Sequence, residues 1–187
     1  PENDNPKCFW QADVEVAAEK LAALLREVDA DVLTIYDDHG GYGHPDHIQV
    51  HRVGVRAAEL AGVSHVFETT MNRDRIKMMM EQQRQAAEGG DIGMTDEERV
   101  QLEESADAGE FGSPEALITH AVDVSEYLDR KRQSMEAHAS QIGEDSFFLQ
   151  MPPEIFSMAF GTEWYIRCDA SRADGAPFGT DLFAGLG

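Results

Sequence analysis

Cysteine is scarce in this 187-residue sequence, and long apolar runs are absent. The two cysteines, Cys8 and Cys168, lie far apart and form no Cys-x-x-Cys pair. This spacing argues against a disulfide framework and favours a reducing, cytoplasmic location. No stretch approaches the roughly eighteen apolar residues that a membrane span needs, so the sequence predicts no membrane span.

Positive charge is also scarce, since 15 Lys and Arg residues face 36 Asp and Glu residues, for a formal net charge of -21. A polyanion would repel such a chain, which argues against nucleic acid as a partner. The segment from Glu88 to Glu110 holds nine acidic residues and one basic residue. This composition predicts an acidic, mobile loop over residues 88–112.

Helix and strand patterns alternate through the first half of the chain. Apolar residues recur with helical period from Asp13 to Val28, and short β-branched runs indicate strands. Asp46 is the expected N-cap of the next helix, and Gly62 its end. The expected elements in this half are a helix at 13–28, a strand at 31–36, a glycine-rich loop at 37–43, a helix at 47–61, a strand at 65–70 and a helix from Asn72.

The second half continues the alternation less regularly. Its expected elements are a strand at 116–122, a helix at 125–142, a short helix at 152–160, a strand at 163–167 and a frayed tail at 168–187. Alternating helices and strands are typical of α/β proteins. We therefore predict an α/β fold, specifically a Rossmann-like three-layer sandwich with a mostly parallel sheet.

The densest polar cluster is Gly40 to His51, with the sequence GGYGHPDHIQVH. It follows a predicted strand and opens a predicted helix, where open α/β sheets bind ligands. His47 and His51 are four residues apart and share a helix face, while His44 precedes them on a proline-stiffened loop. Asp46 is placed to accept an imidazole N–H and fix its tautomer. The spacing predicts a metal or acid–base site, whereas His39, His65 and His120 are interpreted as structural or exposed.

The segment from Tyr36 to His47 resembles the second signature of the LmbE/PIG-L deacetylases. Its YD-x-x-GGYGHPDH form is most similar to the actinobacterial branch of that family. This branch includes the mycothiol-pathway deacetylase and the mycothiol conjugate amidase. Two later patches agree with this resemblance. Residues 131–141 (KRQSMEAHASQ) resemble the family's later K-x-x-A-x-x-x-HxSQ helix, and residues 147–167 resemble the branch's C-terminal stretch. The resemblance therefore covers nearly the whole chain up to Arg167.

The resemblance implies a role for each matching residue. His47 would be a zinc ligand, and His44 would stabilise the tetrahedral oxyanion and protonate the leaving amine. Asp46 would orient His44, and Tyr42 would polarise the amide carbonyl. Gln141 and His138 would line the substrate pocket, and His51 would give structural support.

The resemblance also implies a function and a gap. The function is zinc-dependent hydrolysis of an N-acyl amide, such as that of an N-acetylglucosamine conjugate, to acetate and an amine. The family's first signature, near HPDDE, supplies two further zinc ligands and the general base, but HPD occurs only once here, at 44–46. We therefore expect residues 1–187 to be the C-terminal portion of a single deacetylase domain, with roughly the first hundred residues and the N-terminal strands absent.

Two alternatives remain open at this point. The same histidine and aspartate cluster suits a metal-dependent phosphoesterase, which would hold a second metal and release no acetate. The second alternative is that the chain is a catalytically inactive fragment or a binding module with an incomplete site. The expected partner is a small-molecule amide or sugar conjugate, and a homo-oligomer is left open.

Overall fold

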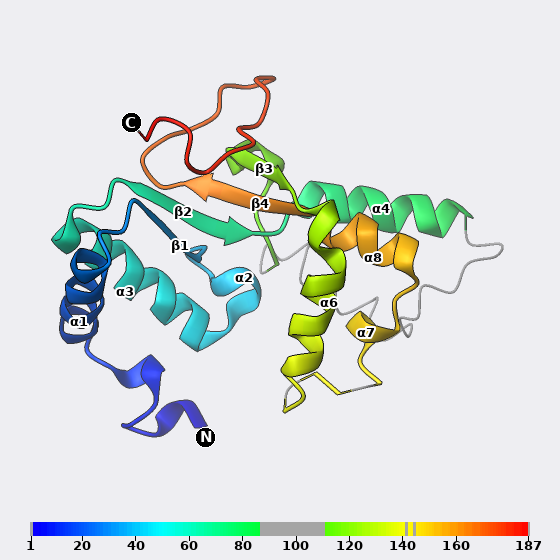
Figure 1. The fold of residues 1–187 in the computed structure, drawn as a ribbon. Coiled ribbons are helices and arrows are strands. Elements are labelled where there is room, and N and C mark those ends of the chain that lie inside the picture. Colours follow the sequence, from blue (N-terminus) through cyan, green and yellow to red (C-terminus); the bar gives the residue numbers. More distant parts are fainter. Residues whose placement is uncertain (1, 87–110, 141, 144, 187) are drawn as a thin grey trace.

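The computed structural model describes residues 2–86, 111–140, 142–143 and 145–186 (Figure 1). Most of the predicted acidic loop at 88–112 lies outside the described residues. Within them, no helix has the length and apolar character needed to cross a membrane. The main elements are α1 (Val14–Glu27), β1 (Val32–Tyr36), α2 (Gly40–Gly43), α3 (Pro45–Ala61), β2 (His65–Thr70), α4 (Arg73–Ala86), β3 (His120–Asp123), α6 (Leu128–Ala137), α7 (Phe147–Gln150), α8 (Pro153–Phe160) and β4 (Thr162–Arg167).

The described strands form one sheet in the order β1-β2-β4-β3. β1 and β2 are parallel, while β4 pairs antiparallel with both β2 and β3. The α/β class is thus confirmed, but the described sheet is mixed rather than mostly parallel. The parallel strands β1 and β2 are joined by a connection that contains α3 and crosses back over the sheet, as parallel neighbours require. Alternation of elements along the sequence does not determine the direction of β4.

α1 and α3 lie side by side on one face of β1 and β2 (Figure 1). Small side chains line the contact between the two helices and allow a close approach. The buried residues of this contact are Ala18, Ala22, Leu25, Val53 and Ala57. Ile35, Ala58 and Val66 continue the core between α3 and the sheet. This packing fixes α3, and with it the histidines at its N-terminal end.

The predicted starts of α1 and α4 and the predicted end of α3 are confirmed. The Asp13 carboxylate accepts a hydrogen bond from the Val16 N–H at 3.0 Å and caps α1. Asn72 caps α4 in the same way, because its side-chain oxygen accepts from the Arg75 N–H at 3.0 Å. Gly62 ends α3 with a left-handed backbone.

The second half departs from its predicted boundaries. The strand expected at 116–122 begins only at His120, because Glu115–Leu117 forms a 3-10 turn after Pro114. The helix expected at 125–142 starts with a 3-10 turn and is regular only as α6. At its end the His138 N–H bonds to the Met135 carbonyl, which tightens the last turn and stops the helix.

The C-terminal segment is attached to the sheet rather than frayed as expected. Gly179 donates its N–H to the Thr119 carbonyl at 3.0 Å and accepts from the Ala121 N–H at 2.9 Å. The Arg172 guanidinium donates to the Ile118 carbonyl at 2.9 Å and lies 4.2 Å from the Phe178 ring centroid. These contacts explain the order of a segment whose composition alone suggests a loose tail.

Gly54 on α3 marks the closest approach of that helix to β1. A Cβ at Gly54 would lie 2.4 Å from Ile35 Cγ2. We expect Gly54→Ala to lower the free energy of unfolding by about 1–2 kcal/mol, because overpacking costs about 1–3 kcal/mol and helix propensity returns up to about 1. Urea unfolding measures the change. In an Ile35→Ala background the same substitution should be neutral or stabilising, and a stabilised Gly54→Ala single variant would contradict this packing.

His120 lies under the C-terminal segment, where a Cβ at Gly179 would meet its ring at 2.4 Å. Burial, followed by the charge of Arg167, lowers the pKa of His120 below its ordinary 6.5. His120 therefore binds a proton more tightly in the unfolded chain than in the folded protein. The contribution of His120 to the free energy of unfolding is present above pH 6.5 and is lost as the pH falls through the folded-state pKa. Urea midpoints between about pH 7.5 and 5 should fall more steeply in the wild type than in His120→Asn, and equal slopes would contradict the expectation.

Candidate functional site

The site is built where β1 ends and α3 begins. β1 delivers Tyr36 and the buried Asp37, and the chain then turns through Gly40 and Gly41, whose φ angles are 68° and 76°. Such angles are readily adopted only by glycine. A Cβ at Gly40 would also lie 2.9 Å from the Cβ of His47, so glycine is required for α3 to approach the turn this closely.

Four rings gather at this point and define a ring cluster of Tyr36, Tyr42, His44 and His47. The His47 imidazole stacks on the Tyr36 ring, with centroids 3.8 Å apart and planes 3° from parallel. His44 lies 4.6 Å from His47, centroid to centroid, and Tyr42 meets the edge of His47 at 5.3 Å. The structure therefore brings together three of the predicted site residues, namely Tyr42, His44 and His47.

His47 has one ring nitrogen engaged by the backbone. Its Nδ1 lies 3.2 Å from the Gly40 carbonyl oxygen, so Nδ1–H donates and the Nε2 lone pair is left available. Burial lowers the pKa of His47 below its ordinary 6.5, partly offset by the Gly40 hydrogen bond. A neutral imidazole with a fixed tautomer is the form that binds metal ions.

His44, rather than Asp46, is the N-cap of α3, because its Nδ1 accepts the Asp46 main-chain N–H at 3.2 Å. In the neutral ring the proton of His44 therefore sits on Nε2. The hydrogen bond between these two residues is thus donated by the Asp46 main-chain N–H to His44, and not by an imidazole N–H to the Asp46 carboxylate as expected. Among the described residues, Asp46 Oδ1 is a buried side-chain oxygen without a hydrogen-bond partner, which marks it as a position for a further donor or cation.

The remaining residues predicted for the site lie at the rim of the ring cluster or away from it. Tyr42 is 56% exposed at the rim of the ring cluster, where it is open to a ligand. His138 is exposed at the end of α6, and its Nδ1 donates to the Ser134 carbonyl at 2.7 Å. Among the described residues, no ring contact or hydrogen bond joins His138 to the ring cluster. Gln141 lies outside the described residues.

His51 occupies the next turn of α3 behind His47. Its Nδ1 lies 3.1 Å from the Tyr36 carbonyl oxygen and 3.4 Å from Glu68 Oε1. Burial raises the pKa of Glu68, although the nearby His51 opposes this. These contacts tie α3 to the ends of β1 and β2, consistent with structural support.

The donor set fits part of a metal site. His47 offers a free Nε2, and Asp46 Oδ1 lacks a partner. Within the described ranges, no group of three or more His, Cys, Asp or Glu residues is arranged to hold a metal ion. A catalytic zinc takes three protein ligands and an open position, so the described residues supply at most a portion of such a site.

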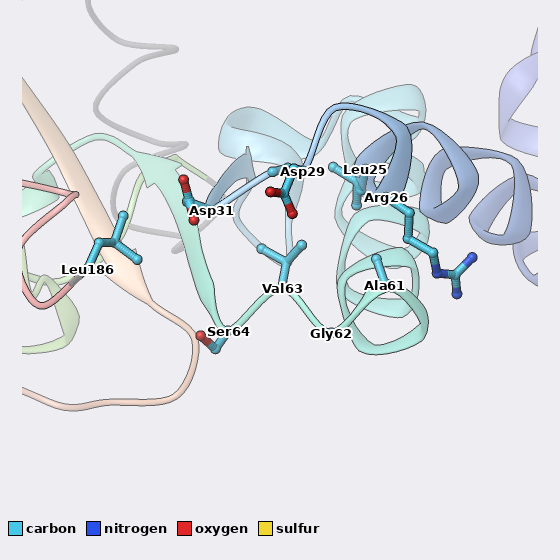
Figure 2. Close-up of a pocket in the computed structure, with 10 residues that line it drawn as sticks. Leu25, Arg26, Asp29, Asp31, Ala61, Gly62, Val63, Ser64 and Leu186 are labelled. Atoms are coloured by element: carbon cyan, nitrogen blue, oxygen red, sulfur yellow. The ribbon is translucent and has the colours of Figure 1, made fainter.

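Two pockets lie away from the ring cluster. One, of about 330 Å³, opens between the end of α1 and the start of β2, with Arg26, Asp31 and Ser64 on its wall (Figure 2). The Arg26 guanidinium points away from it and donates to the Leu60 carbonyl. The other, of about 470 Å³, is an apolar groove beside α1. Neither includes a residue of the ring cluster.

Two residues of the site have no predicted role from the sequence. Tyr36 supplies the stacking surface for His47, and Asp37 anchors the glycine turn by accepting the Gly41 N–H at 2.5 Å. The available signal is position, since a polar residue directly after a buried strand lies at the ligand-binding edge of an α/β sheet.

Comparison with curated proteins gives relatives aligned along the whole chain, whereas no family model matches. The 1D-myo-inositol 2-acetamido-2-deoxy-alpha-D-glucopyranoside deacetylase of Acidothermus cellulolyticus is 37% identical over 193 residues, covering 100% of this chain and 62% of the relative. The protein of the same name from Thermomonospora curvata is 37% identical over 203 residues, covering 100% and 64%. That from Thermobispora bispora is 34% identical over 212 residues, covering 100% and 67%.

The chain thus spans between 62% and 67% of the length of these three relatives. The chain belongs to the LmbE/PIG-L family, in the branch of the mycothiol-pathway deacetylases.

Proposed function

We propose that this chain contributes one part of the active site of a zinc-dependent N-deacetylase. The observation that carries the proposal is His47, whose Nδ1 is held by the Gly40 carbonyl and whose Nε2 has no hydrogen-bond partner among the described residues. His47 would hold the zinc ion, and the remaining ligands and the general base would come from residues outside those described. Bound zinc supplies a Lewis acid and an activated water molecule.

His44 has the geometry for the second chemical role. With Nδ1 occupied by the Asp46 N–H, its proton is carried on Nε2 and is available to a substrate oxygen. The N-terminal end of α3 adds a favourable field for negative charge at this position. His44 would stabilise the oxyanion that forms at the amide carbon and then donate its proton to the leaving nitrogen.

Tyr42 would complete the contacts to the reacting amide. Its ring meets His47 and His44 edge-on at 5.3 and 6.1 Å between centroids, and its side chain is largely exposed. The phenol O–H would donate to the same carbonyl oxygen. In the net reaction the C–N amide bond breaks, and water supplies hydroxide to the acetyl carbon and a proton to the amine.

The substrate class follows from the names of the relatives. They are deacetylases of 1D-myo-inositol 2-acetamido-2-deoxy-alpha-D-glucopyranoside, an N-acetylglucosamine conjugate. We propose a substrate of the same class, with Gln141 and His138 on the substrate side. A Rossmann-like three-layer arrangement, a cytoplasmic location and a homo-oligomer stay predictions.

The test is acetate release by the full-length natural protein from that inositol conjugate, measured after chelator treatment and again after zinc is restored. Zinc-dependent release of one acetate per amine supports the proposal. Release of phosphate from phosphoester substrates without acetate would favour a phosphoesterase, and a protein that binds the conjugate without turnover would be a binding module. Either result overturns the deacetylase assignment.

A further inference from the structure

Asp37 is a buried carboxylate beside the ring cluster that the proposed mechanism does not use. Its side chain is 1% exposed, and its carboxylate lies among polar partners. Oδ1 accepts the Gly41 N–H at 2.5 Å, and Oδ2 accepts the Thr70 hydroxyl at 2.6 Å. His39 Nε2 is 3.4 Å from Oδ2. A buried charge is tolerated only when paired or hydrogen-bonded in this way.

The hydrogen bond from Gly41 leads directly to His47. The Gly41 N–H and the Gly40 carbonyl belong to the same peptide unit. Its N–H donates to Asp37, while its carbonyl oxygen, on the opposite side, accepts His47 Nδ1–H at 3.2 Å. Asp37 and His47 are therefore connected through a single peptide group. Hydrogen bonds in such a chain polarise one another, so the negative charge on Asp37 makes the Gly40 carbonyl a stronger acceptor.

We propose that Asp37 is a positioning residue for His47 and acts through the Gly40–Gly41 peptide. The charged carboxylate holds the peptide plane in place, and the carbonyl then fixes His47 in the tautomer with its proton on Nδ1. This inference rests on the proposed role of His47 as a zinc ligand. Carboxylates commonly orient metal-binding histidines by direct contact; here a peptide group lies between the two.

Further contacts hold Asp37 itself in place. Thr70 Oγ1 lies 3.0 Å from Ser113 Oγ, and both residues are buried. Gly112, next to Ser113, donates its N–H to the Gly41 carbonyl at 2.8 Å. The turn that presents the Gly40 carbonyl is thus held from β1, from the end of β2 and from residues 112–113. This arrangement limits the rotation of the peptide that contacts His47.

Asp37→Asn is the sharpest substitution for the test. Asparagine has the same shape, can accept the Gly41 N–H and can donate to Thr70, so it removes the charge with little change in packing. Asp38→Asn is the matched control, because the neighbouring Asp38 side chain is 80% exposed and its carboxylate accepts a hydrogen bond from His39 at 2.8 Å. Thr70→Val is a second variant that keeps the charge and removes the hydroxyl at Oδ2.

Two measurements on the full-length protein separate this inference from the proposed function. The first is the His47 tautomer in the zinc-free protein, from two-bond 1H–15N NMR correlations assigned with a His47→Gln sample. The second is the zinc dissociation constant, from competition with a chromophoric chelator. Circular dichroism and urea unfolding verify that each variant is folded.

The wild type should show the Nδ1–H tautomer, and Asp37→Asn should populate the Nε2–H tautomer. We expect the zinc dissociation constant to rise about tenfold or more in Asp37→Asn, as for the loss of other groups that orient metal ligands. Asp38→Asn should stay within about twofold of the wild type. Thr70→Val should shift the tautomer in the same direction by a smaller amount, which keeps the test decisive if Asp37→Asn does not fold.

An unchanged Nδ1–H tautomer in folded Asp37→Asn, or in Thr70→Val where Asp37→Asn does not fold, overturns the positioning role of Asp37. A His47→Gln protein that binds zinc like the wild type overturns the proposed function instead. In that case the zinc-free tautomer measurement still decides whether Asp37 positions His47, so the two failures are distinguishable.

Discussion

Replacement of His47 by glutamine is expected to reduce kcat/KM for acetate release by about 10³-fold and to remove bound zinc. A zinc ion supplies several kcal/mol of transition-state stabilisation, and each 1.36 kcal/mol corresponds to a factor of ten in rate. The Gly40 carbonyl holds His47 Nδ1 and so leaves Nε2 to bind zinc, and glutamine offers no imidazole nitrogen in its place. Steady-state kinetics and zinc content after dialysis measure the two effects.

His65→Gln is the control for this experiment. His65 starts β2, away from the ring cluster, and its Nδ1 lies 3.2 Å from the Ser64 hydroxyl. Its replacement should leave zinc content and kcat/KM within about twofold of the wild type. If His47→Gln retained one zinc per chain and wild-type turnover, the assignment of His47 would be wrong.

Replacement of His44 by glutamine is expected to lower kcat by about 10²–10³-fold while zinc stays bound. The reason is that His44 would act on the oxyanion and on the leaving amine, not on the metal. The glutamine side chain has no imidazole proton to transfer to the leaving amine. Single-turnover kinetics, with zinc content measured in parallel, check both parts.

The contrast between the two histidines is the informative result. Loss of zinc in His44→Gln would place this residue on the metal, and an unchanged kcat would remove it from the reaction. The structure supports separate roles, since His44 Nδ1 accepts the Asp46 N–H whereas His47 Nδ1 donates to Gly40. Opposite tautomers in adjacent rings suit one ligand and one proton donor.

Local sequence patterns predict the frame around the site well. The apolar periods of α1 and α3, the helix starts at Asp13 and Asn72 and the β-branched runs of β1 and β2 act over a few residues. The cluster from Tyr42 to His47 is likewise contiguous, and its rings meet because one turn and one helix end position them.

Features that depend on distant parts of the chain are not predicted. The buried partners of Asp37 come from the end of β2 and from Ser113, and only the folded sheet brings Thr70 and Ser113 to the turn. The direction of β4 and the attachment of Gly179 to Thr119 depend on pairing between strands remote in sequence. Periodicity records which face of an element is apolar, but it carries no information about which neighbour covers that face.

Zinc-edge anomalous diffraction from crystals of the zinc-loaded full-length protein tests the central claim most directly. The account predicts one anomalous peak about 2.0–2.1 Å from His47 Nε2, with Nδ1 still directed at the Gly40 carbonyl. A peak on another group of residues, with His47 Nε2 uncoordinated, would contradict the account.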